Sequence, residues 1–167
     1  MLKRVKILDH HEINQKIDRL AWEIYENNLD EESVVIVGVV GRGELLSLRL
    51  SKVIEKISPM KVKLGTIHLN KECPYSHEIT TDLAVSDYTE KVVILVDDVL
   101  NSGKTLMYSS KYFLTTPIIK LSTVSLVDRT HNRFPIKADY VGLSLATTLK
   151  EYITVELQGE RQGVYLS

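Results

Sequence analysis

The sequence predicts a single α/β domain built on a twisted, mainly parallel β-sheet flanked by helices. Short apolar runs that read as buried strands, such as 34–40 and 92–96, alternate along the chain with segments of helical spacing. This alternation is typical of strand–helix–strand units with parallel strands. The chain has 167 residues, of which 44% are hydrophobic, and neither repeats nor a linker divide it. That length suffices for one sheet covered by helices, so we expect residues 1–167 to form one domain.

The N-terminal part of the chain predicts a helix, a strand and a second helix. Asp9 followed by Glu12 indicates a capping box at the start of the first helix. Apolar residues then keep helical spacing until about residue 28: Ile13, Ile17, Leu20 and Ile24. Residues 34–40 form the predicted strand, and residues 44–56 form the second helix.

The second half continues the pattern with one interruption. Residues 62–69 predict a strand, and the polar stretch 70–90 that follows has no clear periodicity. It is long enough to be a flexible functional loop or a small hairpin. After the apolar run 92–96, a helix is expected over 105–114 and another strand over 118–127.

The residues after the run 92–96 combine acids with an anion-binding turn. Asp97 and Asp98 follow a predicted parallel strand, at the end where open α/β sheets bind ligands. The next residues supply backbone N–H groups, hydroxyls and the start of a helix, which suit a phosphate monoester: Asn101, Ser102, Gly103, Lys104 and Thr105. The carboxylates can bind sugar hydroxyls or a metal ion, and the neighbouring amides can bind phosphate. Together these groups fit a phosphorylated sugar.

A Walker A loop is the first alternative for this turn, because Gly103-Lys104-Thr105 matches its last three positions. That motif also needs a glycine five residues before Gly103, where this chain has Asp98. The Walker reading therefore fails. The simpler alternative is a strand end with solvated acids followed by an ordinary helix cap.

A second turn has the same anion-binding character. Val40 is the last residue of the strand 34–40, and Gly41, Arg42 and Gly43 follow it and precede a helix. The glycines let backbone amides approach a diphosphate closely, and Arg42 can form bidentate hydrogen bonds with its oxygens. Strand–glycine–helix turns are common, so this turn alone is a weak signal.

Composition limits the class of protein. The formal net charge is −1, which argues against a strongly basic nucleic-acid footprint, although a local basic face remains open. Cys73 is the only cysteine, so no intramolecular disulfide can form. Residues 1–8 are too short and too charged for a signal peptide, and no stretch resembles a membrane span. We expect a cytoplasmic protein with no membrane partner.

Residues 92–105 resemble the phosphoribosyl diphosphate (PRPP) binding motif of type I phosphoribosyltransferases. In that family the two acids hold the ribose 2′- and 3′-hydroxyls and the loop binds the 5′-phosphate. The resemblance implies these roles for Asp97, Asp98 and residues 101–105, with Mg²⁺ bound through PRPP and the two acids as further candidate ligands. Residues 40–43 match the pyrophosphate loop, where a strained or cis peptide is expected between Val39 and Gly41.

The resemblance extends over almost the whole chain to the pyrimidine-operon attenuation regulators that double as uracil phosphoribosyltransferases. Three stretches carry it: residues 7–9 with the helix that follows, residues 92–100, and residues 126–142. It implies uracil as the base and a homodimer or larger homo-oligomer. It also implies a hood built from the N-terminal segment and about 128–167, with the base near Asp128 and Arg129.

Departures from the family pattern affect which residues are expected to be catalytic and which base is favoured as substrate. Lys71 stands where the family has an arginine in the flexible loop, so Lys71 and Arg42 are the expected catalytic cations, with Asp97 and Asp98. Asn101 replaces an aspartate of the hypoxanthine type, and an amide takes up no proton usefully at neutral pH. A purine is therefore the less favoured substrate.

The regulatory role of this branch needs a basic RNA-binding face. Arg19 and His131 match residues that the family uses near RNA, but Asp18 and Trp22 stand where a hydroxyl and a histidine are typical. Leu143 stands where a lysine is typical, and the loss of cations together with the acid gained at Asp18 weakens attraction to phosphates. Arg19 has an alternative partner in Glu23 at i+4. Catalysis is therefore favoured, and a pyrimidine nucleotide-sensing regulator with weak or no catalysis is the alternative.

Overall fold

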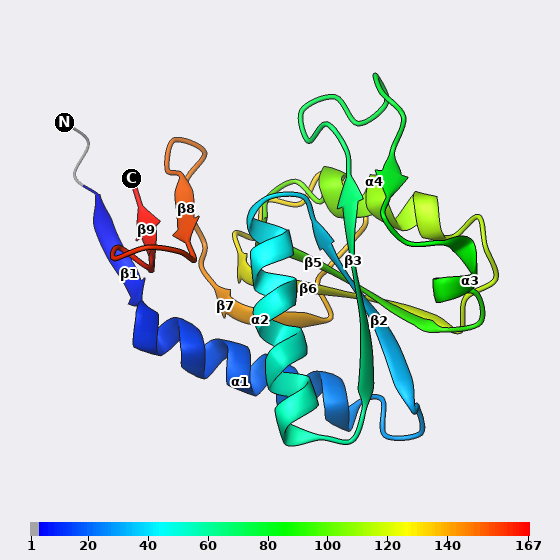
Figure 1. Cartoon of the computed structure of the whole chain (residues 1–167). Helices are drawn as coiled ribbons and strands as arrows, with labels where there is room; N and C mark the ends of the chain where they lie inside the picture. The colour runs from blue at the N-terminus through cyan, green and yellow to red at the C-terminus, as the bar shows by residue number, and fades with distance from the viewer. Residues whose placement is uncertain (1–3) are drawn as a thin grey trace.

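The computed structural model describes residues 4–167. Its main sheet consists of β2 (Ser33–Val39), β3 (Lys61–His68), β4 (Thr80–Thr81), β5 (Val92–Leu100), β6 (Lys120–Asp128) and β7 (Tyr140–Ser144). The strands lie in the order β4-β3-β2-β5-β6-β7 (Figure 1). Every neighbouring pair is parallel except β3 and β4. The predicted α/β class with a mainly parallel sheet is confirmed.

Helices cover both faces of this sheet. α1 (His10–Glu26) and α2 (Arg42–Ile57) pack on one face, and α3 (Val85–Tyr88) and α4 (Lys104–Phe113) on the other. Alternate residues of β2 contact opposite faces: Val34 and Ile36 join the α1–α2 side, whereas Val35 and Val37 join the α4 side. Burial on both faces explains why the strands read as continuous apolar runs.

The predicted capping box begins α1. The Asp9 carboxylate accepts a 2.8 Å hydrogen bond from the Glu12 amide, and the Glu12 carboxylate accepts a 2.9 Å bond from the Asp9 amide. The helix ends at Glu26, slightly before the predicted residue 28. The side-chain amide of Asn28 donates to the Ile24 carbonyl at 2.7 Å and so satisfies one of the last free carbonyls.

A second, antiparallel sheet joins the two ends of the chain. It consists of β1 (Val5–Asp9), β9 (Gly163–Leu166) and β8 (Ile153–Glu156), in the order β1-β9-β8. Its apolar side chains pack with the α1–α2 side of the core through Leu8, Val155 and Val164. β7 lies within the segment 128–167 that was assigned to the hood, but it belongs to the main sheet.

The polar stretch 70–90 is only partly a loop. β4 pairs with β3, and α3 buries Tyr88 with its ring edge-on to Phe113 at 5.0 Å between centroids. Residues 80–90 therefore pack against the sheet, and residues 70–79 remain as a mostly exposed loop. The hairpin alternative was thus correct for part of the stretch. None of the described helices has the length and apolar character needed to cross a membrane.

Candidate active site

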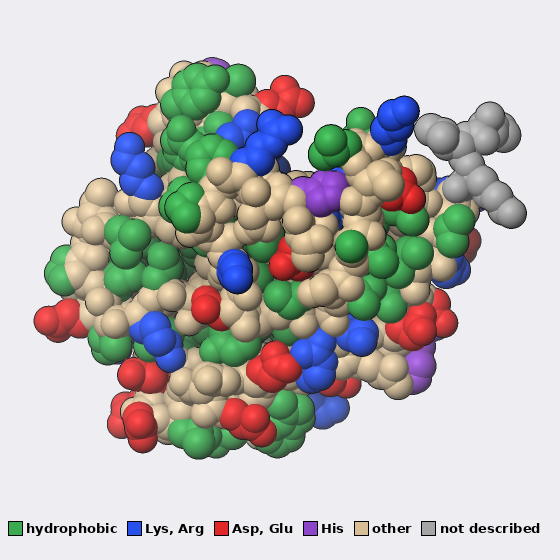
Figure 2. Space-filling model, turned by 180° about the vertical axis from the view of Figure 1, so that it is seen from behind, with side chains coloured by type: hydrophobic (Ala, Val, Ile, Leu, Met, Phe, Trp, Pro, Cys, Tyr) green, Lys and Arg blue, Asp and Glu red, His purple; other side chains and the backbone are tan. Residues whose placement is uncertain are grey.

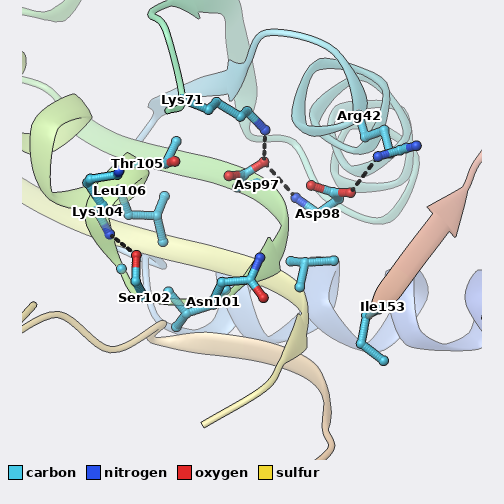
Figure 3. Close-up of a pocket in the computed structure, with 13 residues that line it drawn as sticks. Arg42, Lys71, Asp97, Asp98, Asn101, Ser102, Lys104, Thr105, Leu106 and Ile153 are labelled. Carbon is cyan, nitrogen blue, oxygen red and sulfur yellow. Dashed lines mark hydrogen bonds and ion pairs between the residues drawn. The ribbon is translucent and has the colours of Figure 1, made fainter. Parts of the chain in front are cut away.

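The two predicted anion-binding turns and the acid pair meet at one pocket. A cavity of about 310 Å³ lies beyond the centre of the sheet (Figure 3). It is lined by Arg42, Lys71, Asp97, Asp98, Val99, Leu100, Asn101, Ser102, Gly103, Lys104, Thr105, Leu106 and Ile153. Ligands of open α/β sheets bind in such a crevice at the carboxyl ends of the strands.

The acid pair lies within β5, which continues past its predicted end at Val96 to Leu100. Asp97 and Asp98 are 4% and 6% exposed. One oxygen of Asp97 accepts hydrogen bonds of 3.0 Å from the Asp98 amide and from Lys71 Nζ. Burial, and then the charge of Asp98, raise the pKa of Asp97 to about 7, while Lys71 acts in the opposite direction. This carboxyl group is therefore held near its protonation midpoint at neutral pH.

Each carboxylate faces one cation, as Figure 3 shows. Lys71 reaches Asp97 from the loop 70–79, and Arg42 Nη1 lies 3.9 Å from Asp98 Oδ2. The side chains of Arg42 and Lys71 are 53% and 40% exposed. The pocket therefore offers two partly exposed cations to an anionic ligand.

The phosphate turn is shaped by Gly103 and by a neighbouring segment. Gly103 has a φ of 85°, and a Cβ there would lie 2.6 Å from a methyl carbon of Ile136, so only glycine fits. The Ser102 carbonyl accepts bonds of 2.8 and 3.0 Å from the amides of Arg133 and Phe134. α4 begins at Lys104, so its first N–H groups have no partner within the helix. The Lys104 amide donates to Ser102 Oγ at 3.3 Å. The remaining amides of this turn, with the Ser102 and Thr105 hydroxyls, provide the donors that an anion site needs.

The pyrophosphate turn differs from the expectation in two respects. Residues 4–167 contain no cis peptide bond, and the unusual backbone is instead a φ of 93° at Gly41. The Val40 amide donates to the Ile67 carbonyl at 3.0 Å, and Val40 does not line the pocket. Gly43 must stay small, because a Cβ there would lie 2.6 Å from the Val96 carbonyl oxygen. The amides at the start of α2 are thus the available donors.

A contact that the sequence did not indicate joins the loop 70–79 to the phosphate turn. Lys104 Nζ donates a 2.7 Å hydrogen bond to the Glu72 carbonyl, next to Lys71. The loop is therefore anchored over the pocket at two places, through Lys71 on the acid pair and through Lys104. A lid in this position excludes water from a reaction below it.

The two side chains expected at the nucleobase do not line the pocket. Asp128 accepts a 2.8 Å bond from the Thr130 amide and closes the turn after β6. Arg129 is 8% exposed and is committed to acceptors that include Asn101. Direct contact of these two side chains with a base therefore has no support in this geometry, whereas Asn101 does line the pocket.

The two candidate RNA contacts are also engaged within the fold. Arg19 pairs with Glu23 at 2.6 Å, the i+4 partner considered above, and donates to the Val141 and Gly142 carbonyls. The His131 ring is hydrogen-bonded to the Thr147 carbonyl.

The pocket suits a divalent cation only together with a ligand. Residues 4–167 contain no group of three or more His, Cys, Asp or Glu side chains that could hold a metal. Mg²⁺ is usually bound by one or two carboxylates together with substrate phosphate oxygens. Asp97 and Asp98 fit that mode.

Comparisons with known proteins agree with this geometry. The "Phosphoribosyl transferase domain" family matches residues 4–157. "Bifunctional protein PyrR" of Staphylococcus aureus strains JH9 and Newman is 34% identical over 159 residues, covering 91% of each chain. Among solved structures, a hypoxanthine-guanine phosphoribosyltransferase of Bacillus anthracis has a TM-score of 0.78 at 19% identity, covering 96% of this chain and 95% of that one. The hypoxanthine phosphoribosyltransferase of Trypanosoma cruzi has a TM-score of 0.80 at 17% identity, covering 96% and 94%. The chain belongs to the type I phosphoribosyltransferase family.

Proposed function

We propose that this protein transfers the phosphoribosyl group of PRPP to a nucleobase, with uracil favoured, to give UMP and pyrophosphate. One observation carries the proposal: the buried pair Asp97 and Asp98 shares a pocket with the first turn of α4. Carboxylates accept hydrogen bonds from sugar hydroxyls, and helix N-termini bind phosphate. The pocket therefore matches the two ends of a ribose 5-phosphate.

The residues of the pocket would hold the sugar and stabilise the charge that develops during transfer. In the reaction a bond forms between a base nitrogen and the anomeric carbon, and the bond from that carbon to the diphosphate oxygen breaks. The base nitrogen loses its proton, which is taken up by the departing diphosphate or by solvent. Asp97 and Asp98, fixed on β5, stabilise the positive charge of the sugar ring. Residues 102–105 hold the 5′-phosphate and so fix the position of the anomeric carbon.

Arg42 and Lys71 would neutralise the leaving diphosphate. Both now face the acid pair and are partly exposed, so they can turn toward an anion. Asp97 and Asp98 would hold Mg²⁺ together with the substrate, and the ion would supply positive charge for the departing diphosphate. The loop 70–79, anchored by Lys104, would keep water from the reacting carbon.

The choice of uracil is supported by the sequence resemblance to the uracil-transferring regulators and by the 34% identity to "Bifunctional protein PyrR". A purine is the second alternative. The solved structures named for hypoxanthine are 17–19% identical to this chain, so they support the fold and not the base.

A pyrimidine nucleotide sensor that regulates RNA is the other alternative, since the relative is named bifunctional. Arg19 and His131 are held by internal hydrogen bonds. On the face shown in Figure 2, the described Lys and Arg side chains are interspersed with Asp and Glu. RNA phosphates are attracted by clustered cations, so transfer is favoured over RNA binding. A homodimer or larger assembly stays part of the proposal.

The test is turnover with a panel of bases. The protein is mixed with PRPP, Mg²⁺ and each of uracil, hypoxanthine, guanine, adenine and orotate, and nucleotide and pyrophosphate are followed. We expect UMP formation that the Asp98→Asn variant loses. Nucleotide from another base would correct the substrate, and nucleotide binding without turnover would favour the sensor.

A further inference from the structure

Arg129 is a buried cation whose hydrogen bonds all go to neutral oxygens. Its Nη1 donates to Asn101 Oδ1 at 2.8 Å and its Nε to Thr147 Oγ1 at 2.9 Å. Its Nη2 donates to the carbonyls of Thr148 and Glu151 at 3.2 and 2.6 Å. Its own amide donates to the Leu100 carbonyl at 3.0 Å, which fixes it beside the end of β5. Arg129 therefore joins the phosphate turn to the segment before β8.

This contact determines which way the Asn101 amide is turned. A guanidinium group has donors and no acceptor, so the Asn101 atom that faces it must be the oxygen. The amide nitrogen is then turned away from Arg129. Figure 3 shows that nitrogen on the side of Asp97 and Asp98, with the oxygen on the opposite side. No hydrogen bond from this nitrogen to the described residues is present, and Asn101 is exposed in the pocket.

Asn101 lies where a base would sit if the proposed function holds. The acid pair and residues 102–105 are assigned to ribose and phosphate, and Arg42 and Lys71 to diphosphate. The remaining lining is apolar apart from Asn101: Val99, Leu100, Leu106 and Ile153. Apolar side chains suit the faces of a flat base, and of the described residues lining the pocket Asn101 alone carries a carboxamide.

We propose that Asn101, oriented by Arg129, selects bases that present an acceptor beside the reacting nitrogen, such as the 2-oxo group of a pyrimidine. This inference rests on the proposed function and names the substrate class of the same site. Asn101 is the specificity-determining residue, and Arg129 is a positioning residue that acts through it. A base that presents an N–H or C–H group at this place leaves the Asn101 side-chain N–H without an acceptor. Binding of that base is therefore disfavoured.

The test compares UMP with 2-thio-UMP, because the two nucleotides differ only in the exocyclic atom on C2, the carbon next to the glycosidic nitrogen. Sulfur is a weak acceptor. Binding is measured by calorimetry, so the test does not need turnover. The wild type should bind UMP about tenfold more tightly than 2-thio-UMP, as one hydrogen bond allows. Asn101→Asp, which has the same shape and no donor, should abolish this preference.

Matched variants separate this effect from charge and from folding. Asn14→Asp is the control, because Asn14 Oδ1 also accepts from an arginine, Arg49, but lies outside the pocket lining. It should keep the tenfold preference. Arg129→Lys keeps a donor toward Asn101 and should retain the preference, whereas Arg129→Gln can donate or accept and should reduce it.

The outcomes distinguish the inference from the proposed function. A preference that is absent in the wild type, or that survives in Asn101→Asp, overturns the inference even if uracil is converted to UMP. A preference that follows Asn101 supports the inference even if no base is turned over, in which case the transferase proposal fails. Absence of UMP binding by the folded wild type overturns the inference and the choice of uracil, while the base panel decides the transferase proposal.

Discussion

Replacing Asp97 by asparagine should stabilise the protein while it removes PRPP binding. The pKa of Asp97 is raised from 3.8 to about 7, first by burial and then by Asp98. The unfolded carboxyl group ionises above about pH 4, whereas the folded one stays protonated until about pH 7. Wild-type stability is therefore lost as the pH rises between these values. Asparagine at this position does not titrate, and its side-chain oxygen can still accept from the Asp98 amide.

The size of the effect follows from the two pKa values. A difference of about 3 pKa units, at about 1.36 kcal/mol each, gives an upper limit of about 4 kcal/mol above pH 7. Replacement of a buried ion pair by well-packed neutral residues is often neutral or stabilises the protein by about 1–4 kcal/mol, and Lys71, the partner of Asp97, is 40% exposed and can be solvated when the carboxylate is removed. We expect a gain of that order for Asp97→Asn at pH 8, which shrinks toward pH 4.

Urea unfolding followed by circular dichroism at pH 5, 6, 7 and 8 measures this difference. The control is Asp18→Asn on the exposed side of α1, which should change the unfolding free energy by less than about 0.5 kcal/mol at every pH. A loss of stability in Asp97→Asn at pH 8, or a gain that does not vary between pH 5 and 8, would refute this reasoning.

Three further predictions concern the cations and the turns. Lys71→Met should lower kcat by about 10²-fold in steady-state assays, and Lys71→Arg should retain most activity, because the cation neutralises the leaving group. Lys104→Met should release the loop 70–79 and so speed chymotryptic cleavage after Tyr75, which is 74% exposed. An unchanged cleavage rate would contradict the claim that Lys104 holds this loop in place. Gly41→Ala should cost about 1 kcal/mol in thermal unfolding because of its positive φ, and Gly43→Ala more, because of its close backbone contact. Equal losses would contradict this order.

The elements with local signals were predictable from the sequence. The capping box at Asp9 predicts the start of α1, and the alternation of strands and helices predicts the α/β class. Both signals are local, because they depend on hydrogen bonds and periodicity among residues close in the sequence. The acid pair and Gly103 predict a phosphorylated sugar site, and the structure brings them to one pocket, because the direction of parallel strands fixes where their ends meet.

Features that depend on distant segments were not predictable. Ile153 lies on β8 of the small sheet and lines the pocket because β8 contacts β5, which is distant in the sequence. Tyr88 packs on Phe113 with no periodic neighbour to indicate a helix, so the loop was predicted too long. Arg129 was assigned to the base, but burial and four side-chain hydrogen bonds commit it to Asn101 and the residues beyond β7.

Binding of PRPP in the presence of Mg²⁺ tests most directly the claim that the acid pair and the first turn of α4 form a phosphoribosyl site. Calorimetry should show binding by the wild type, equal binding by Asp18→Asn, and at least tenfold weaker binding by Asp98→Asn, since hydrogen bonds to charged groups contribute about 1.5–3 kcal/mol. Equal affinity in Asp98→Asn and the wild type, or no PRPP binding by the folded wild type, would contradict the account.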